Sequence, residues 1–133
     1  MPFRDLQALV FELTRWLALA TMIGLLAPII GLSRAAAQEP VTLNGEIVDL
    51  SCYLSQGSKG KRHKQCAILC AKKGLPIGVL TDAGDVYLLI EDHDAPESYE
   101  AAKGLAGERA TVSGKQFSKG GVRSVLIAEI KEE

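Results

Sequence analysis

Apolar residues are arranged in two different ways along this chain. Residues 16–32 form an almost unbroken apolar run, whereas the later apolar stretches are short and are separated by Gly, Pro and charged residues. A run of this kind behind the basic residues Arg4 and Arg15 is typical of an export signal. Ala35-Ala36-Ala37 supplies the small residues of an Ala-x-Ala cleavage site. The pattern therefore predicts a signal peptide over residues 1–37.

The same apolar run could instead stay in the chain as a membrane anchor. Its length lies at the short end of the roughly 17 to 25 residues that cross a bilayer as a helix. Pro28 and Gly31 interrupt a helix close to the cleavage site, which favours cleavage. We expect an exported, periplasmic protein that contacts the membrane, through this segment, only if the segment is not cleaved. An uncleaved segment would anchor the domain to the inner membrane, facing the periplasm.

Residues 38–133 have the length of one small domain, and their pattern predicts mainly β structure. Short apolar stretches rich in β-branched residues predict five strands, at residues 41–50, 77–81, 86–90, 109–117 and 122–130. Turn-forming residues at 82–85 and 118–121 predict that the last four strands form two hairpins. Good helix formers ending at Gly74 predict a short helix over 62–73, and Pro96 begins a second one over 96–105.

Five strands with a helix between the third and fourth are the order of an OB-fold, a small five-stranded barrel. The segment 51–74 would then be a helical insertion after the first strand. We therefore expect a single OB-like β-barrel domain over residues 38–133, with two short helices. A split β-sandwich or a mixed α+β roll would contain the same elements.

Composition argues against several classes of function. The chain has 15 Lys and Arg residues against 16 Asp and Glu residues, so it has no overall attraction for nucleic acid. Aromatic residues, which stack on single-stranded bases, make up 5% of the chain. The sequence also contains no G-x-S-x-G motif, no H-E-x-x-H motif and no phosphate-binding glycine loop. We expect a non-enzymatic protein that does not bind nucleic acid.

The strongest chemical signal is a group of three cysteines and one histidine in a short segment, Cys52, His63, Cys66 and Cys70. If residues 62–73 are helical, the spacings of three and four residues place His63, Cys66 and Cys70 on one side of the helix. Cys52, at the end of the first strand, is then a candidate fourth ligand. The group predicts a metal site of Cys3His type, with zinc as the first expectation and copper or iron as alternatives.

Disulfide and thiol chemistry remain as alternatives. An odd number of cysteines leaves at least one thiol outside any intramolecular disulfide. Cys66 and Cys70 are too far apart in a regular helix to pair, whereas Cys52 could pair with either of them. The result would be a disulfide-stapled interaction domain with one free thiol, or a thiol-redox protein.

Other polar residues near the cysteines offer weaker signals. Asp49 either orients His63 or only ends the first strand. Six basic residues near the cysteines could form a solvated surface, or could lower thiol pKa values and attract an anionic ligand: Lys59, Lys61, Arg62, Lys64, Lys72 and Lys73. Residues 91–94 are expected to form a polar loop rather than a metal site. A protein that donates or accepts the metal would be the natural partner.

Three segments together resemble a group of small exported bacterial proteins, most of them uncharacterised. These are Gly45 to Tyr53, His63 to Cys70 and Gly74 to Gly78, and their most specific part is D-x-x-C-Y followed by the H-x-x-C-A segment that closes at Cys70. The resemblance extends over nearly the whole region after the leader. It implies an OB-like β domain with a cysteine segment, and it implies no particular activity.

Overall fold

The computed structural model describes residues 38–133, which form a five-stranded mixed β-barrel with three short helices. The strands are β1 (Glu39–Asp49), β2 (Ile77–Thr81), β3 (Val86–Ile90), β4 (Arg109–Lys119) and β5 (Val122–Glu132). They close in the order β1-β2-β3-β5-β4. The β3–β5 pair is parallel and the other neighbours are antiparallel.

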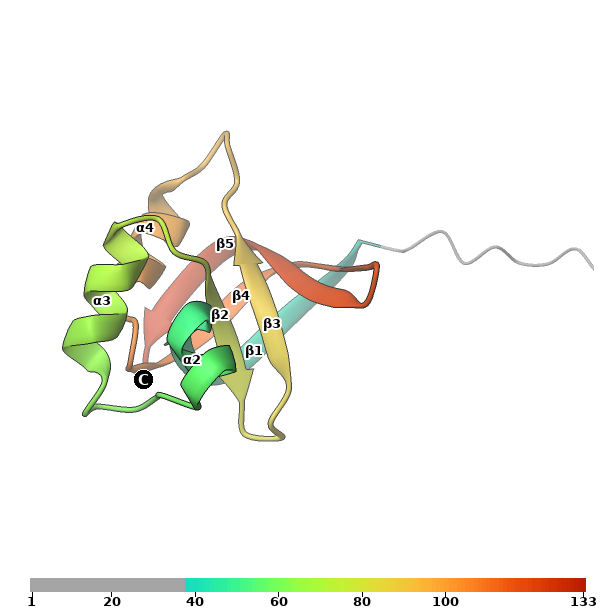
Figure 1. Ribbon diagram of the computed structural model, residues 1–133. Helices are drawn as coiled ribbons and strands as arrows, with labels where there is room; N and C mark the ends of the chain where they lie inside the picture. Colours follow the sequence, from blue (N-terminus) through green and yellow to red (C-terminus); the bar gives the residue numbers. More distant parts are fainter. Residues whose placement is uncertain (1–37) are drawn as a thin grey trace, which may run out of the picture. The chain divides into compact units, whose positions relative to one another are not determined.

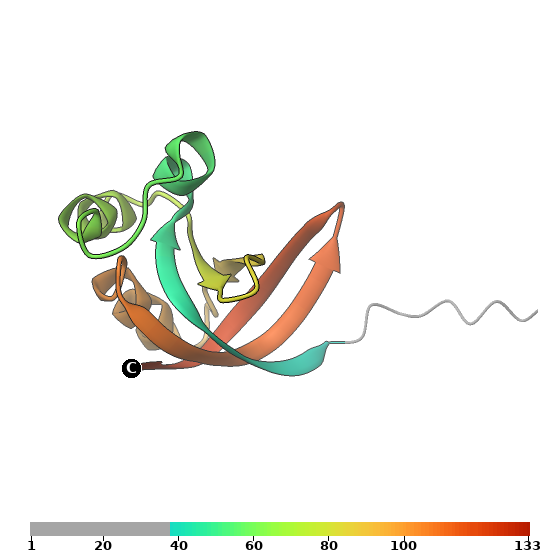
Figure 2. The ribbon, with the colours of Figure 1, turned by 90° about the horizontal axis from the view of Figure 1, so that it is seen from below.

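All five predicted strands and both predicted hairpins are present. The closed barrel excludes the sandwich and the roll that the same order of elements allowed. The β4–β5 hairpin projects to the opposite end of the barrel from the helices, as Figure 1 and the turned view in Figure 2 show. The predicted signal peptide and cleavage site lie outside the described residues. Over the described part of the chain, no helix is long and apolar enough to span a bilayer.

The number of helices differs from the sequence prediction of two. In addition to α3 (Lys64–Lys72) and α4 (Glu97–Gly104), the structure has α2 (Leu50–Gln56), directly after β1. The predicted first strand, 41–50, therefore begins two residues late and ends one residue late, and Cys52 lies in a helix rather than at a strand end. The cause is local: the Asp49 side chain accepts hydrogen bonds from the amides at the start of α2, and Gly57 ends the helix with a left-handed backbone.

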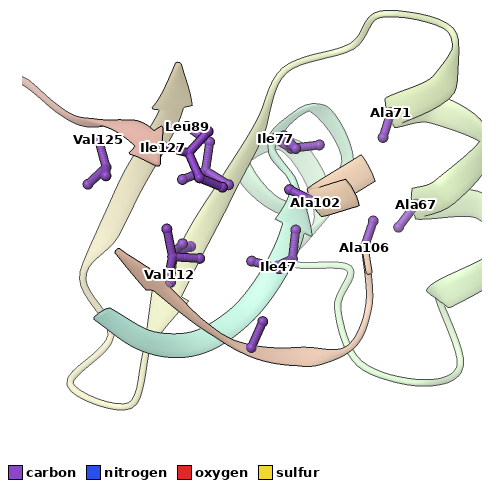
Figure 3. Close-up of a cluster of buried hydrophobic side chains, with 12 residues drawn as sticks. Ile47, Ala67, Ala71, Ile77, Leu89, Ala102, Ala106, Val112, Val125 and Ile127 are labelled. Carbon is purple, nitrogen blue, oxygen red and sulfur yellow. The ribbon is translucent and has the colours of Figure 1, made fainter. Parts of the chain in front are cut away.

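The hydrophobic core lies inside the barrel and extends under α3 and α4. Figure 3 shows barrel residues such as Ile47 and Ile127 together with alanines of the two helices. Ala67 and Ala71, one turn apart on α3, are almost completely buried. Because they have no side chain beyond Cβ, α3 can lie close to the barrel. The row of residues beside them on α3 contains Cys66 and Cys70, so core packing fixes the direction of both cysteines.

Candidate metal centre

The helical insertion between β1 and β2 carries all four residues that the sequence singled out. Cys52 is in α2, His63 is the N-cap residue of α3, and Cys66 and Cys70 follow along α3. The predicted helix over 62–73 begins later than expected, at Lys64. Figures 1 and 2 show α2 and α3 side by side at one side of the barrel. The cysteines of α3 therefore lie next to the helix that carries Cys52.

Cys52 is the centre of the cluster. One ligand atom each of Cys52, His63 and Cys66 lie within 4.8 Å of one another, and the same holds for Asp49, Cys52 and Cys70. The structure thus brings together the predicted residues as two overlapping groups of three that share Cys52. Ligands about 2.3 Å from a zinc ion at tetrahedral angles are about 3.8 Å apart, so small side-chain adjustments would close either group around an ion.

For Asp49, the sequence left two roles open: orienting His63 or only ending the first strand. Asp49 is only 1% exposed, and its two carboxylate oxygens accept hydrogen bonds from Ser51 N at 3.0 Å and from Cys52 N at 3.4 Å. Asp49 ends β1, as the second of these alternatives states. Its carboxylate groups with Cys52 and Cys70 rather than with His63. An Asp immediately before a helix that ends at a glycine is an N-cap signal, and that signal in residues 49–57 would have revealed α2.

The His63 side chain is available for a ligand. Although His63 occupies the N-cap position of α3, its imidazole makes no capping hydrogen bond. Within residues 38–133, its Nε2 atom is buried and has no hydrogen-bond partner. Leaving a buried polar atom unsatisfied costs about 1–3 kcal/mol. An imidazole that lies beside two thiols and has a buried ring nitrogen without a partner is suited to bind a cation.

The three cysteines are free thiols, and the pKa values of two of them are raised. The hydrogen bond with Asp49, helped by burial and by the negative charge of that carboxylate, raises the pKa of Cys52 to about 12. Burial, followed by a hydrogen bond with Cys66, raises the pKa of Cys70. The possible lowering of thiol pKa values by surrounding cations is not seen at these two positions, because the Asp49 carboxylate at Cys52 and burial at Cys70 raise the pKa instead.

The basic residues are exposed, apart from one that supports the start of α3. The five that are exposed are Lys59, Lys61, Arg62, Lys72 and Lys73. Lys64 Nζ instead lies 2.7 Å from Glu108 Oε1, which ties the first turn of α3 to the segment before β4. On the same segment, Gly107 lies so close that a Cβ atom there would be 2.6 Å from Lys64 Cα. The position of His63 and Cys66 thus depends on a contact with a distant part of the chain.

The loop at residues 91–94 has a local role. Asp92 Oδ1 accepts a hydrogen bond from Asp94 N at 3.1 Å, as in a polar turn. Within the described range 38–133, the converging groups of potential metal ligands are the two around Cys52, and neither includes this loop.

We compared the chain with protein families, curated proteins and solved structures. No protein-family model, no curated protein and no solved structure matches the chain.

Proposed function

We propose that this protein is a non-enzymatic metal-binding domain that holds one zinc ion through Cys52, His63, Cys66 and Cys70. The observation that carries the proposal is the convergence of Cys52, Cys66 and His63 within 4.8 Å, together with the buried, unpartnered Nε2 of His63. Thiolate and imidazole are the ligands of structural zinc sites. Copper(I) accepts the same donors, and iron is a further alternative.

In this proposal the five residues of the cluster have different roles. Cys52, His63 and Cys66 bind the ion directly, and Cys70 completes a tetrahedral set from the next turn of α3. Asp49 remains the cap of α2 and accepts hydrogen bonds, so that it orients Cys52 as ligand-supporting carboxylates commonly do. The donors lie on two short helices outside the barrel, and Cys66 is exposed. A protein that donates or accepts the metal could therefore reach the site.

The wider setting of the site is part of the same proposal. A five-stranded closed barrel with a helix between the third and fourth strands supports an OB-type domain. The leader pattern of residues 1–37 supports action outside the cytoplasm, in the periplasm or attached to the inner membrane and facing it. In an oxidising compartment, a bound metal would protect the three thiols from oxidation.

The proposal is tested by the zinc content and zinc affinity of the full chain purified under reducing conditions. We expect about one zinc ion per chain, and His63→Ala should weaken binding about 100-fold, because loss of a ligand should cost at least as much as loss of a residue that only supports one. His93→Ala is the matched control, since His93 is exposed and lies in no converging group. A wild-type protein that binds no transition metal, or equal effects of the two substitutions, would contradict the proposal.

Zinc binding should also release protons. At neutral pH the Cys52 thiol is protonated, since its pKa is raised to about 12, and a bound thiolate has no proton. Zinc must therefore displace at least one proton, and its affinity should rise with pH by about tenfold per pH unit for each proton displaced. Zinc affinity measured between about pH 6.5 and about pH 7.5 checks this. An affinity that does not change over that interval would argue against Cys52 as a ligand.

A further inference from the structure

Cys52 is shared by the two groups of potential ligands, and this position allows a second chemistry. Its sulfur lies within 4.8 Å of the sulfur of Cys66 and also of the sulfur of Cys70. We infer that the site is also a dithiol switch: a low-molecular-weight disulfide oxidises Cys52 and Cys66 to an intramolecular disulfide, and this oxidation expels the metal. The metal half of the inference rests on the proposed function, whereas formation of the disulfide does not.

The helices determine which pair can form. Residues four apart on one helix have Cβ atoms about 5–6 Å apart, whereas a disulfide needs about 3.5–4.5 Å. A Cys66–Cys70 disulfide would therefore break α3. Cys52 lies on a different helix, joined to α3 by a short loop in which Gly57 and Gly60 have positive φ angles. Approach of α2 to α3 can bring Cys52 to bonding distance without unwinding either helix.

Accessibility determines the order of events. Cys66 is exposed, whereas Cys52 and Cys70 are half-buried. The Cys66 thiolate attacks one sulfur of the external disulfide, whose S–S bond breaks and releases the first small thiolate. The Cys52 thiol then loses its proton to solvent as its sulfur attacks Cys66 Sγ, and the bond to the second small thiol breaks. Two protein thiols are oxidised, one external disulfide is reduced to two thiols, and the two protein-thiol protons pass to the released thiolates through solvent.

Loss of Cys52 removes a ligand from both groups at once. Disulfide sulfurs are neutral and bind zinc far more weakly than thiolates do. After oxidation, only His63 would remain of the first group and Asp49 and Cys70 of the second, with no shared ligand between them. The same residue therefore completes the metal site when reduced and dismantles it when oxidised.

The disulfide is tested on the full chain, reduced and free of metal, by incubation with oxidised glutathione and mapping of the products by mass spectrometry. We expect the wild type to lose two hydrogens and to contain a Cys52–Cys66 bond. Cys52→Ser should stop at a mixed disulfide on Cys66, and Cys70→Ser, the matched control, should form the bond as the wild type does. Mixed disulfides or intermolecular dimers alone in the wild type, or a bond that excludes Cys52 or Cys66, would overturn the inference.

The link to the metal is tested by zinc binding before and after oxidation. We expect oxidation to weaken zinc binding at least about 100-fold and a reducing agent to restore it, since two thiolate ligands are lost together. Equal affinities of the reduced and oxidised protein would overturn the switch. A reduced protein that binds no zinc would overturn the proposed function and the link, while the mass-spectrometric result alone decides the disulfide.

Discussion

Replacing Cys52 by serine should reduce zinc affinity more than any other single change in the cluster. Cys52 belongs to both converging groups, whereas Cys70 belongs to one. Even residues that only support metal ligands contribute about 10–100-fold to affinity, so we expect Cys52→Ser to weaken binding by more than about 100-fold. Cys70→Ser should have a smaller effect, because Cys52, His63 and Cys66 still converge without it. Competition with a chromogenic zinc chelator under reducing conditions measures both variants.

The Cys52 experiment needs a control for folding. Cys52 is only half-buried and lies in a short surface helix, so serine there should leave the barrel intact. Far-ultraviolet circular dichroism of the metal-free variants should match that of the wild type. If folded Cys70→Ser loses more affinity than folded Cys52→Ser, Cys52 is not the shared ligand, and the arrangement proposed around it is wrong.

Gly107→Ala should destabilise the protein and also weaken zinc binding. Gly107 has a φ of +86°, and an added Cβ would be 2.6 Å from Lys64 Cα at the start of α3. The left-handed conformation costs a residue with a Cβ about 1–2 kcal/mol, and overpacking adds about 1–3 kcal/mol. The free energy of unfolding should therefore fall by about 2–5 kcal/mol. Relief of the clash moves α3, so zinc affinity should fall as well.

Gly84→Ala is the matched control, because it separates backbone strain from the clash. Gly84 has the same φ of +86°, but a Cβ there would have no atom within 4 Å. The free energy of unfolding of Gly84→Ala should fall only by the cost of the left-handed conformation, about 1–2 kcal/mol. The variant should bind zinc as the wild type does. Denaturant unfolding of the reduced, metal-free proteins measures the first effect, and chelator competition measures the second. Equal losses of stability in the two variants would show that the contact with Lys64 does not position α3.

The barrel was largely predictable because its signals are local. Alternating apolar residues and turn residues such as those at 82–85 mark each strand and hairpin, and the structure confirms five strands and a helix between the third and fourth. The helix at Leu50–Gln56 was missed because Leu50, after Asp49, extends the apolar pattern of the strand before it. The signal that marks it is the Asp49 cap with the Gly57 stop, and that signal is weaker than the strand pattern before it.

Residue types and helical spacing are local properties, so the sequence alone shows which ligands are available for a metal and that Cys66 and Cys70 project from one side of a helix. Which of them meet Cys52 depends on contacts that form only in the folded chain. The N–H of Leu50 donates to the Pro76 carbonyl at 2.9 Å and holds α2 at the barrel, while Gly107 and Glu108 hold the start of α3. Contacts between residues so far apart in the chain leave no periodic trace in the sequence. The grouping of Asp49 with Cys52 and Cys70, and the burial of His63 Nε2, follow from them.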